Sequence, residues 1–265
     1  METEILISIF QTLIAIGIFA ILVYIGKYLA NNDRLMSSFK NSRFANPLEY
    51  FPSEEIFSLN QVSYLIMILI FIVISLYLTF DWADGSYFIR CLDIIISIYL
   101  AVKLEKESFK GKLMLFLLIP FGSITGLLYG DNIVVLLDIF HIIGYLYYVK
   151  VYFRKFMKYT ENNGLGITIM LLFAIVTFSF IFTIIVEGVS PMDSMTMVTN
   201  AFTSNSYEAS GKIMAGKINS LIIAWGGFIL SGVGTATLAA SIVNRYVDRE
   251  FEDIKDIIRN KKEEN

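Results

Sequence analysis

Seven long apolar runs constrain this chain more than any other feature of its sequence. They hold 140 of the 265 residues but only three of the 45 formal charges, Arg90, Asp93 and Asp138. A bilayer core about 30 Å thick requires about 20 apolar residues per helix, and flanking residues can complete the shorter runs. We therefore predict seven transmembrane helices. The runs are 5–26, 62–80, 87–102, 113–129, 132–149, 165–186 and 218–243.

Lysine and arginine are concentrated in alternate loops. The loops before the second, fourth and sixth runs, together with the C-terminal tail, contain 18 of the 21 cations. Because positively charged loops stay on the cytoplasmic side, this distribution predicts a cell-membrane protein with its N-terminus outside and its C-terminus in the cytoplasm. The first run is interpreted as a retained helix rather than a signal peptide, since Glu2 and Glu4 precede it and Lys27 follows it.

Composition argues against several classes of protein. Only 17% of the residues are charged, against roughly 25% in soluble domains. The single cysteine, Cys91, and the single histidine, His141, provide no zinc or iron–sulfur ligand set, and the net charge of −3 offers no footprint for nucleic acid. The sequence shows no paired intramembrane carboxylates and no nucleophile–base pair, so we expect neither an enzyme nor a cofactor.

The segment between the last two runs, residues 187–220, is too long for a tight turn and too apolar for a solvated loop. Pro191 can open a short apolar helix that ends near Phe202, and the polar residues Thr203 to Glu208 follow it. A short helix that dips into a membrane and returns as an extended polar strand needs protein or a water-filled cavity to shelter its backbone. The segment therefore predicts a re-entrant pore helix and a filter loop.

This order of elements resembles the voltage-gated-like cation channel superfamily, most closely its potassium-channel branch. DSMTMVTNAFTSNSYEA at 193–209 resembles the family's pore helix with its TTVGYGD filter, and residues 216–245 resemble its inner helix. The resemblance implies an all-α polytopic membrane protein and a homotetramer that conducts K⁺ or Na⁺ passively through a pore formed by residues 191–245. The filter residues that it implies are Thr203, Ser204, Asn205, Ser206, Tyr207 and Glu208.

The filter departs from the potassium pattern, and two registers remain open. Ser206 and Glu208 stand where the family has glycines, at a cost of order 1 to 2 kcal/mol for each residue held in left-handed backbone. In the second register, TSNSY at 203–207 resembles the TLESW filter of bacterial sodium channels, with Asn205 in place of the selecting glutamate. Glu208 then either rings the mouth and concentrates cations or lies in an outer vestibule with no selective role.

One pore loop per chain lines a quarter of a fourfold pore, which implies four copies around an axis. In the last run, glycines either bend the helix or let it pack closely, and both interpretations remain open. The neighbouring hydroxyls of Thr235 and Thr237 are expected to border the aqueous cavity. The four glycines are Gly226, Gly227, Gly232 and Gly234.

Residues 61–160 occupy the position of the family's four-helix voltage sensor, but the fifth run lacks its arginines. Lys150 and Arg154 come only after this run, and without intramembrane cations steep voltage dependence is not expected. Two charged pairs have a spacing of three residues within one helix. Arg90 and Asp93 are expected to pair locally, and Asp138 and His141 to form a buried pair or a pH-sensitive contact.

The predicted organisation has five parts: an N-terminal helix (1–30), an interfacial loop (31–60), the sensor-like domain (61–160), the pore domain (164–245) and a cytoplasmic helix (246–265). The last forms either a bundle among four subunits or a surface helix under the membrane. It leaves no room for a ligand-binding domain, so soluble ligands would act through a separate regulatory subunit. The alternatives to a potassium-like channel are a non-selective or sodium-conducting pore and a non-conducting scaffold or signalling subunit.

Overall fold

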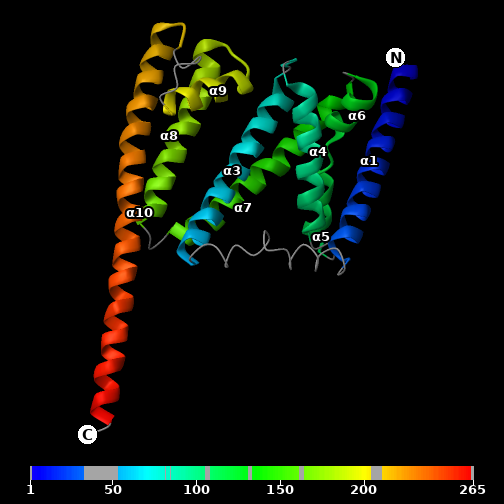
Figure 1. Ribbon diagram of the computed structural model, residues 1–265. Helices are drawn as coiled ribbons and strands as arrows, with labels where there is room; N and C mark the ends of the chain where they lie inside the picture. Colours follow the sequence, from blue (N-terminus) through cyan, green and yellow to red (C-terminus); the bar gives the residue numbers. More distant parts are fainter. Residues whose placement is uncertain are drawn as a thin grey trace. The chain divides into compact units, whose positions relative to one another are not determined.

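The computed structural model describes residues 2–32, 53–80, 82–83, 85–104, 108–130, 133–160, 164–203 and 211–263. This part of the chain is helical and contains no strand (Figure 1). Six of its segments are long and apolar enough to cross a membrane, which makes the chain a multi-pass membrane protein. They are Thr3–Ala30, Gln61–Thr79, Phe109–Tyr129, Ile133–Lys158, Ile167–Glu187 and Met214–Val233.

The chain divides into two compact units. Unit 1 is Met1–Lys158 with Ser190–Met192, and unit 2 is Tyr159–Val189 with Asp193–Asn265. The helices of unit 1 are α1 (Glu2–Ala30), α3 (Ser53–Thr79), α4 (Ser86–Val102), α5 (Phe109–Leu117), α6 (Phe121–Tyr129), the short 3₁₀ helix η3 (Ile133–Leu137) and α7 (Asp138–Thr160). Unit 2 contains α8 (Gly164–Glu187), most of α9 (Pro191–Phe202) and α10 (Met214–Glu263).

The third apolar run forms α4, which has 17 residues and carries Arg90 and Asp93. It is shorter than the six candidate spans, so a seventh crossing stays a prediction. The short helix expected after Pro191 is confirmed as α9, which has 12 residues. Before it, α8 ends at Glu187 and is followed by Gly188, whose left-handed φ of 63° and N–H bond to the Ile184 carbonyl are typical of a glycine after a helix end.

Unit 1 is a helical bundle in which α4 packs against α1, α3 and α6 (Figure 1). Its core contains a group of aromatic rings that join α3 to α7. Phe71 stacks on Tyr145 at 5.0 Å between ring centroids and meets Tyr152 edge-on at 5.6 Å. Phe71 and Tyr145 are fully buried. Large rings that interlock in this way fix the position of α7, which carries the polar groups described below.

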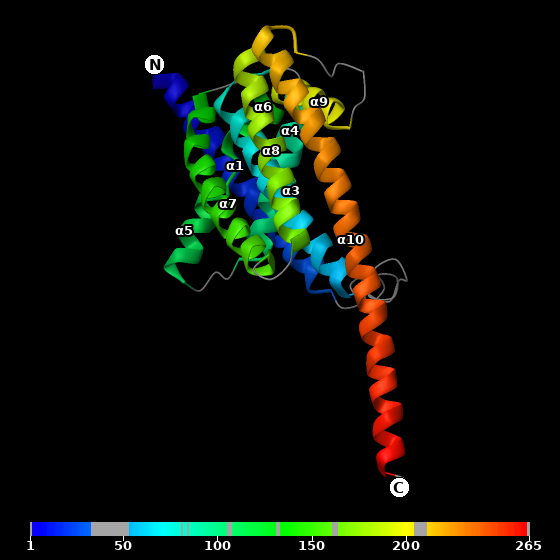
Figure 2. The same ribbon diagram turned by 90° about the vertical axis from the view of Figure 1, so that its left-hand side faces the viewer.

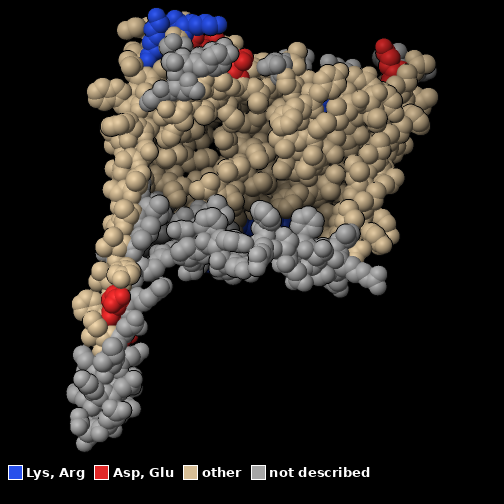
Figure 3. Space-filling model, in the orientation of Figure 1, with Lys and Arg blue, Asp and Glu red and all other residues tan. Residues whose placement is uncertain are grey.

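The helices present apolar side chains to the outside, as expected for contact with lipid. On the face in Figure 3, most of the surface of the described residues is uncharged, and charged atoms gather mainly at its upper edge and in one patch at the lower left. On α1, Leu6 and Phe10 are examples of large exposed apolar side chains. In unit 2, α8 runs beside α10, and α10 continues as one helix of 50 residues (Figure 2).

Candidate functional site

In unit 2, polar side chains attach α9 and α10 to α8. Ser194 of α9 donates a hydrogen bond to the Phe180 carbonyl at 2.7 Å, and both residues are buried. Asn219 of α10 donates to the Thr183 hydroxyl at 3.0 Å. Because residues 180 and 183 are one turn apart on α8, this helix holds its two neighbours at adjacent positions.

Glu187, the last residue of α8, supports the start of α10. Its carboxylate accepts the backbone N–H groups of Lys212 at 3.0 Å and of Ile213 at 3.2 Å, just before α10 begins. The first amides of a helix have no partner within the helix, and a carboxylate there also interacts favourably with the helix dipole. A Cβ at Gly211 or Gly216 would collide with this carboxylate, so both glycines leave room for it.

A hollow of about 1000 Å³ lies where the C-terminal end of α9 meets the middle of α10. Phe202 and Thr203 contribute the α9 side, and small or hydroxyl-bearing residues contribute much of the α10 side. The described residues place no formal charge in this lining. The lining from α10 includes Gly227, Ser231, Gly232, Thr235 and Ala236.

The contact between α9 and α10 depends on Gly227. A Cβ there would lie 2.5 Å from the Phe202 carbonyl oxygen and 2.9 Å from its ring carbon Cδ2. This glycine therefore allows the end of α9 to approach α10. The C-terminal end of a helix carries a partial negative charge of about half an elementary charge, which favours cations nearby. The hollow thus has hydroxyl groups in its lining and no formal charge among its described lining residues. The end of α9 beside it attracts cations.

The predicted pore residues fall into three groups. Thr203 and Thr235 line the hollow, whereas Ser204, Asn205, Ser206, Tyr207 and Glu208 lie outside the described residues. Gly227 has the close contact that the packing interpretation predicts. At Gly226 an added Cβ would meet only ordinary contacts at 3.8 Å, and at Gly232 it would meet open space. Gly234 and Thr237 lie within α10, and their surroundings are outside the described part.

A second group of polar residues surrounds a helix break in unit 1. Pro120 lacks an N–H group and separates α5 from α6 within one apolar segment, which leaves backbone groups without helical partners. Two side chains of α7 form hydrogen bonds with these backbone groups. The Nδ1 atom of His141 lies 2.9 Å from the Leu117 carbonyl oxygen at the end of α5. The Gly122 N–H at the start of α6 donates to Asp138 Oδ1 at 2.7 Å.

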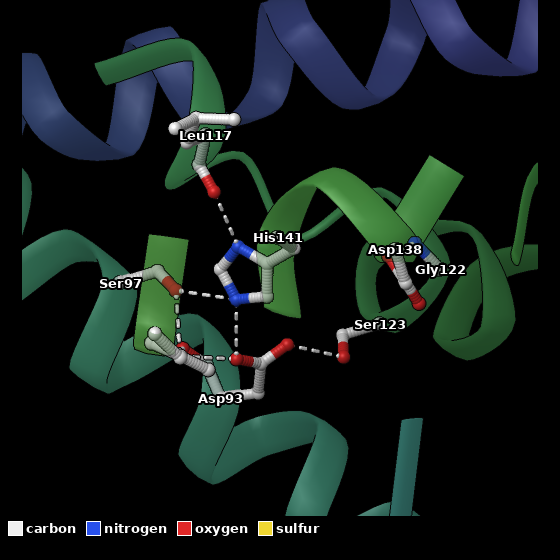
Figure 4. Close-up of polar contacts among 8 residues, drawn as sticks. Asp93, Ser97, Leu117, Gly122, Ser123, Asp138 and His141 are labelled. Carbon is white, nitrogen blue, oxygen red and sulfur yellow. Dashed lines mark hydrogen bonds and ion pairs between the residues drawn. The ribbon is translucent and has the colours of Figure 1, made fainter. Parts of the chain in front are cut away.

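Asp93 of α4 lies at the centre of this cluster (Figure 4). Its Oδ1 atom is 2.9 Å from His141 Nε2 and accepts a bond from the Tyr145 hydroxyl, and its Oδ2 atom accepts a bond from the Ser123 hydroxyl at 2.6 Å. All four side chains are fully buried. A buried charge in an apolar bundle is tolerated only when it is paired and hydrogen-bonded, and here three donors converge on the carboxyl group.

The ring of His141 has an acceptor at each nitrogen. The Leu117 carbonyl can only accept, so Nδ1 carries a hydrogen, and the proton between Nε2 and Asp93 belongs to the pair. The hydroxyls of Tyr145 and Ser123 donate to the same carboxyl group and add no charge to the pair. The cluster then carries no net charge from its His141–Asp93 pair.

The structure differs from the sequence prediction in how these charges pair. His141 contacts Asp93 on another helix rather than Asp138, three residues earlier on its own helix. The local pairing of Arg90 with Asp93 stays a prediction. Sequence reasoning missed Ser123 and Tyr145, and it also missed Ser97 of α4, whose hydroxyl lies 3.0 Å from the Tyr145 hydroxyl. The signal that could have indicated the cluster is Pro120, because a proline inside an apolar span leaves backbone groups that need polar partners. Lys150 and Arg154 lie exposed on α7.

Within the described ranges, no group of three or more His, Cys, Asp or Glu side chains is placed to hold a metal ion. Comparison of the chain with protein-family models, with curated proteins and with solved structures gives no match.

Proposed function

We propose that the chain is one subunit of a tetrameric cation channel in the plasma membrane, with a pore formed by residues 191–245 that conducts K⁺ or Na⁺ passively. The observation that carries this proposal is the hollow between the end of α9 and the middle of α10. It is lined by hydroxyls and small residues, and a helix C-terminus with partial negative charge borders it. These are properties that a cavity for a hydrated cation requires.

Four copies around an axis would close this open hollow into a pore. Phe228 and Val233 line it and are 81% and 46% exposed in the single chain, which supports packing against neighbouring subunits. In this arrangement α9 is the re-entrant pore helix, the residues after Thr203 form the filter, and α4 completes seven crossings. The N-terminus lies outside and the C-terminal end of α10 in the cytoplasm, where a separate regulatory subunit could bind.

Unit 1 takes the place of a sensor domain with little response to voltage. Between Asp138 and Lys150, α7 has no lysine or arginine. Moving one charge through the membrane yields about 2.3 kcal/mol per 100 mV, so a segment without such charges gains little from the field. Single-channel recording should show an open probability that changes only weakly with voltage, and a steep curve worth several elementary charges would contradict this assignment.

Ion flux into liposomes tests the proposal directly. Purified protein should pass K⁺ or Na⁺ but exclude N-methyl-D-glucamine, and the ratio of the two fluxes ranks potassium against sodium conduction. Thr235→Trp should block flux by filling the hollow, whereas the matched control Ile222→Trp, at an exposed position of α10 outside the lining, should leave flux intact. Glu208→Gln should lower flux if its carboxylate concentrates cations.

The outcomes separate the alternatives. Flux that both tryptophan variants leave unchanged would place the pore elsewhere in the chain. Absence of flux from folded, tetrameric protein would favour the non-conducting scaffold or signalling subunit. Equal passage of K⁺ and Na⁺ would establish a non-selective pore.

A further inference from the structure

A cavity of about 260 Å³ lies in unit 1 beside the break between α5 and α6. It is distinct from the hollow in unit 2 and plays no part in the proposed pore. Its walls include the aromatic side chains of Tyr77 and Trp82, together with Gly122 at the start of α6. Two lining residues carry opposite formal charges, Arg90 from α4 and Asp138 from α7.

Asp138 has hydrogen-bonding capacity that the fold leaves unused. The residue is 1% exposed, and its Oδ1 atom accepts the Gly122 N–H. Its Oδ2 atom is buried and has no hydrogen-bond partner among the residues that the structure describes. A buried carboxylate oxygen without a donor is costly, and a donor supplied from the cavity would remove that cost.

The two charges are held about one helical turn apart by glycines of α6. The carboxylate of Asp138 occupies the space beside Gly122, where a Cβ would collide with it. The guanidinium of Arg90 packs on Gly126, where a Cβ would lie 2.6 Å from Nη1. Positions four residues apart on a helix are separated by about 6 Å along its axis. The cavity therefore has one negative and one positive end, and their formal charges cancel.

We propose that this cavity binds a small zwitterion, with its ammonium group on Asp138 and its anionic oxygen on Arg90. A volume of about 260 Å³ is slightly below that of drug-sized sites, which suits a ligand the size of an amino acid. Broken helices at membrane depth commonly form small-ligand sites, because they expose backbone and side-chain polar groups to a sheltered space. Two sources share this chemistry, a free amino acid and a phosphoethanolamine lipid headgroup.

Trp82 lines the cavity and provides a direct readout of binding. The chain has two tryptophans, so Trp225→Phe leaves Trp82 as the single reporter. Titration of this full-length variant in detergent with glycine should give a saturable change in fluorescence. Methylammonium and acetate, which each carry one of the two charges, should bind at least about tenfold more weakly. In nanodiscs, phosphatidylethanolamine should shift the Trp82 signal relative to phosphatidylglycerol if the headgroup is the occupant.

Asp138→Asn and Arg90→Gln should each weaken glycine binding, or the phosphatidylethanolamine response, by about tenfold or more. Arg90→Lys should restore most of it. Arg90→Gln should in addition favour methylammonium over glycine, which a purely structural role of the arginine would not produce. Glu4→Gln is the matched control, because this exposed carboxylate of α1 lies outside the cavity lining.

Each outcome decides the proposal. Loss of binding in both charge variants but not in the control supports it and identifies the source of the zwitterion. If neither glycine nor phosphatidylethanolamine alters Trp82, or if both charge variants bind as the parent does, the proposal is overturned. Should Asp138→Asn fail to fold, the comparison of Arg90→Gln with Arg90→Lys decides the proposal: weaker binding in the first and recovery in the second support it, and parental binding in both overturns it. Because the readout is fluorescence, the result is independent of whether the protein conducts ions.

Discussion

Replacement of Asp93 by alanine should destabilise unit 1 more than any removal of a single hydroxyl. The carboxylate accepts bonds from His141, Tyr145 and Ser123, all fully buried. Asp93→Ala removes this acceptor from all three donors, of which Tyr145 keeps a contact with the Ser97 hydroxyl at 3.0 Å. Each unsatisfied buried group costs about 1 to 3 kcal/mol, and breaking a buried ion pair costs about 3 to 5 kcal/mol. We expect a loss of about 3 to 5 kcal/mol in the free energy of unfolding.

Ser123→Ala provides the comparison, since it removes one of those bonds and leaves no charge behind. Hydrogen bonds between membrane helices average about 0.6 kcal/mol, so we expect a loss near that value. Equilibrium unfolding of purified protein in mixed micelles measures both variants. The double variant Asp93→Leu with His141→Leu should recover part of the stability that Asp93→Ala loses, because it removes both members of the pair. The groups that lose a hydrogen-bond partner are then the Leu117 carbonyl and the hydroxyls of Tyr145 and Ser123. Equal, small losses for Asp93→Ala and Ser123→Ala would refute the buried ion pair.

Two further predictions concern unit 2. Gly227→Ala should destabilise it by about 1 to 3 kcal/mol, because the added Cβ clashes with Phe202. Gly226→Ala should be neutral or stabilising by up to about 1 kcal/mol, because an added Cβ there has its nearest contact at 3.8 Å and alanine favours a helix. Thermal unfolding distinguishes them, and equal destabilisation by both would contradict the packing role of Gly227. Glu187→Ala should cost about 1 to 2 kcal/mol, as the loss of a helix cap does, and should speed hydrogen exchange at the amides of Lys212 and Ile213. Unchanged exchange at these two amides would show that the carboxylate does not hold them.

The helices could be predicted from the sequence because their signals are local. Long apolar runs predict the six candidate spans, and Pro191 predicts the beginning of α9. The third run corresponds to α4, whose 17 residues include Arg90 and Asp93, and its crossing of the membrane stays a prediction. These charges shorten the apolar stretch and direct α4 toward polar partners inside unit 1.

The polar contacts could not be predicted in the same way because they join residues far apart in the chain. His141 and Asp93 are 48 positions apart, and only the folding of unit 1 brings this residue of α7 to this residue of α4. A spacing of three residues within one helix favoured Asp138 as the partner of His141, but the break at Pro120 requires a donor at one end and an acceptor at the other. In an apolar bundle, hydrogen bonds to otherwise unpartnered backbone groups stabilise the fold more than an ion pair within one helix would.

The unbroken course of α10 has a mechanical consequence. Its 50 residues extend about 75 Å at 1.5 Å per residue, and no glycine or proline interrupts it after Gly234. Such a rod transmits torsion along its length, so twisting the far end by about 100° presents the next residue in place of Thr235 at the hollow. A partner that binds and turns the C-terminal end of α10 would therefore change which side chains line the hollow, and hence the lining of the proposed pore.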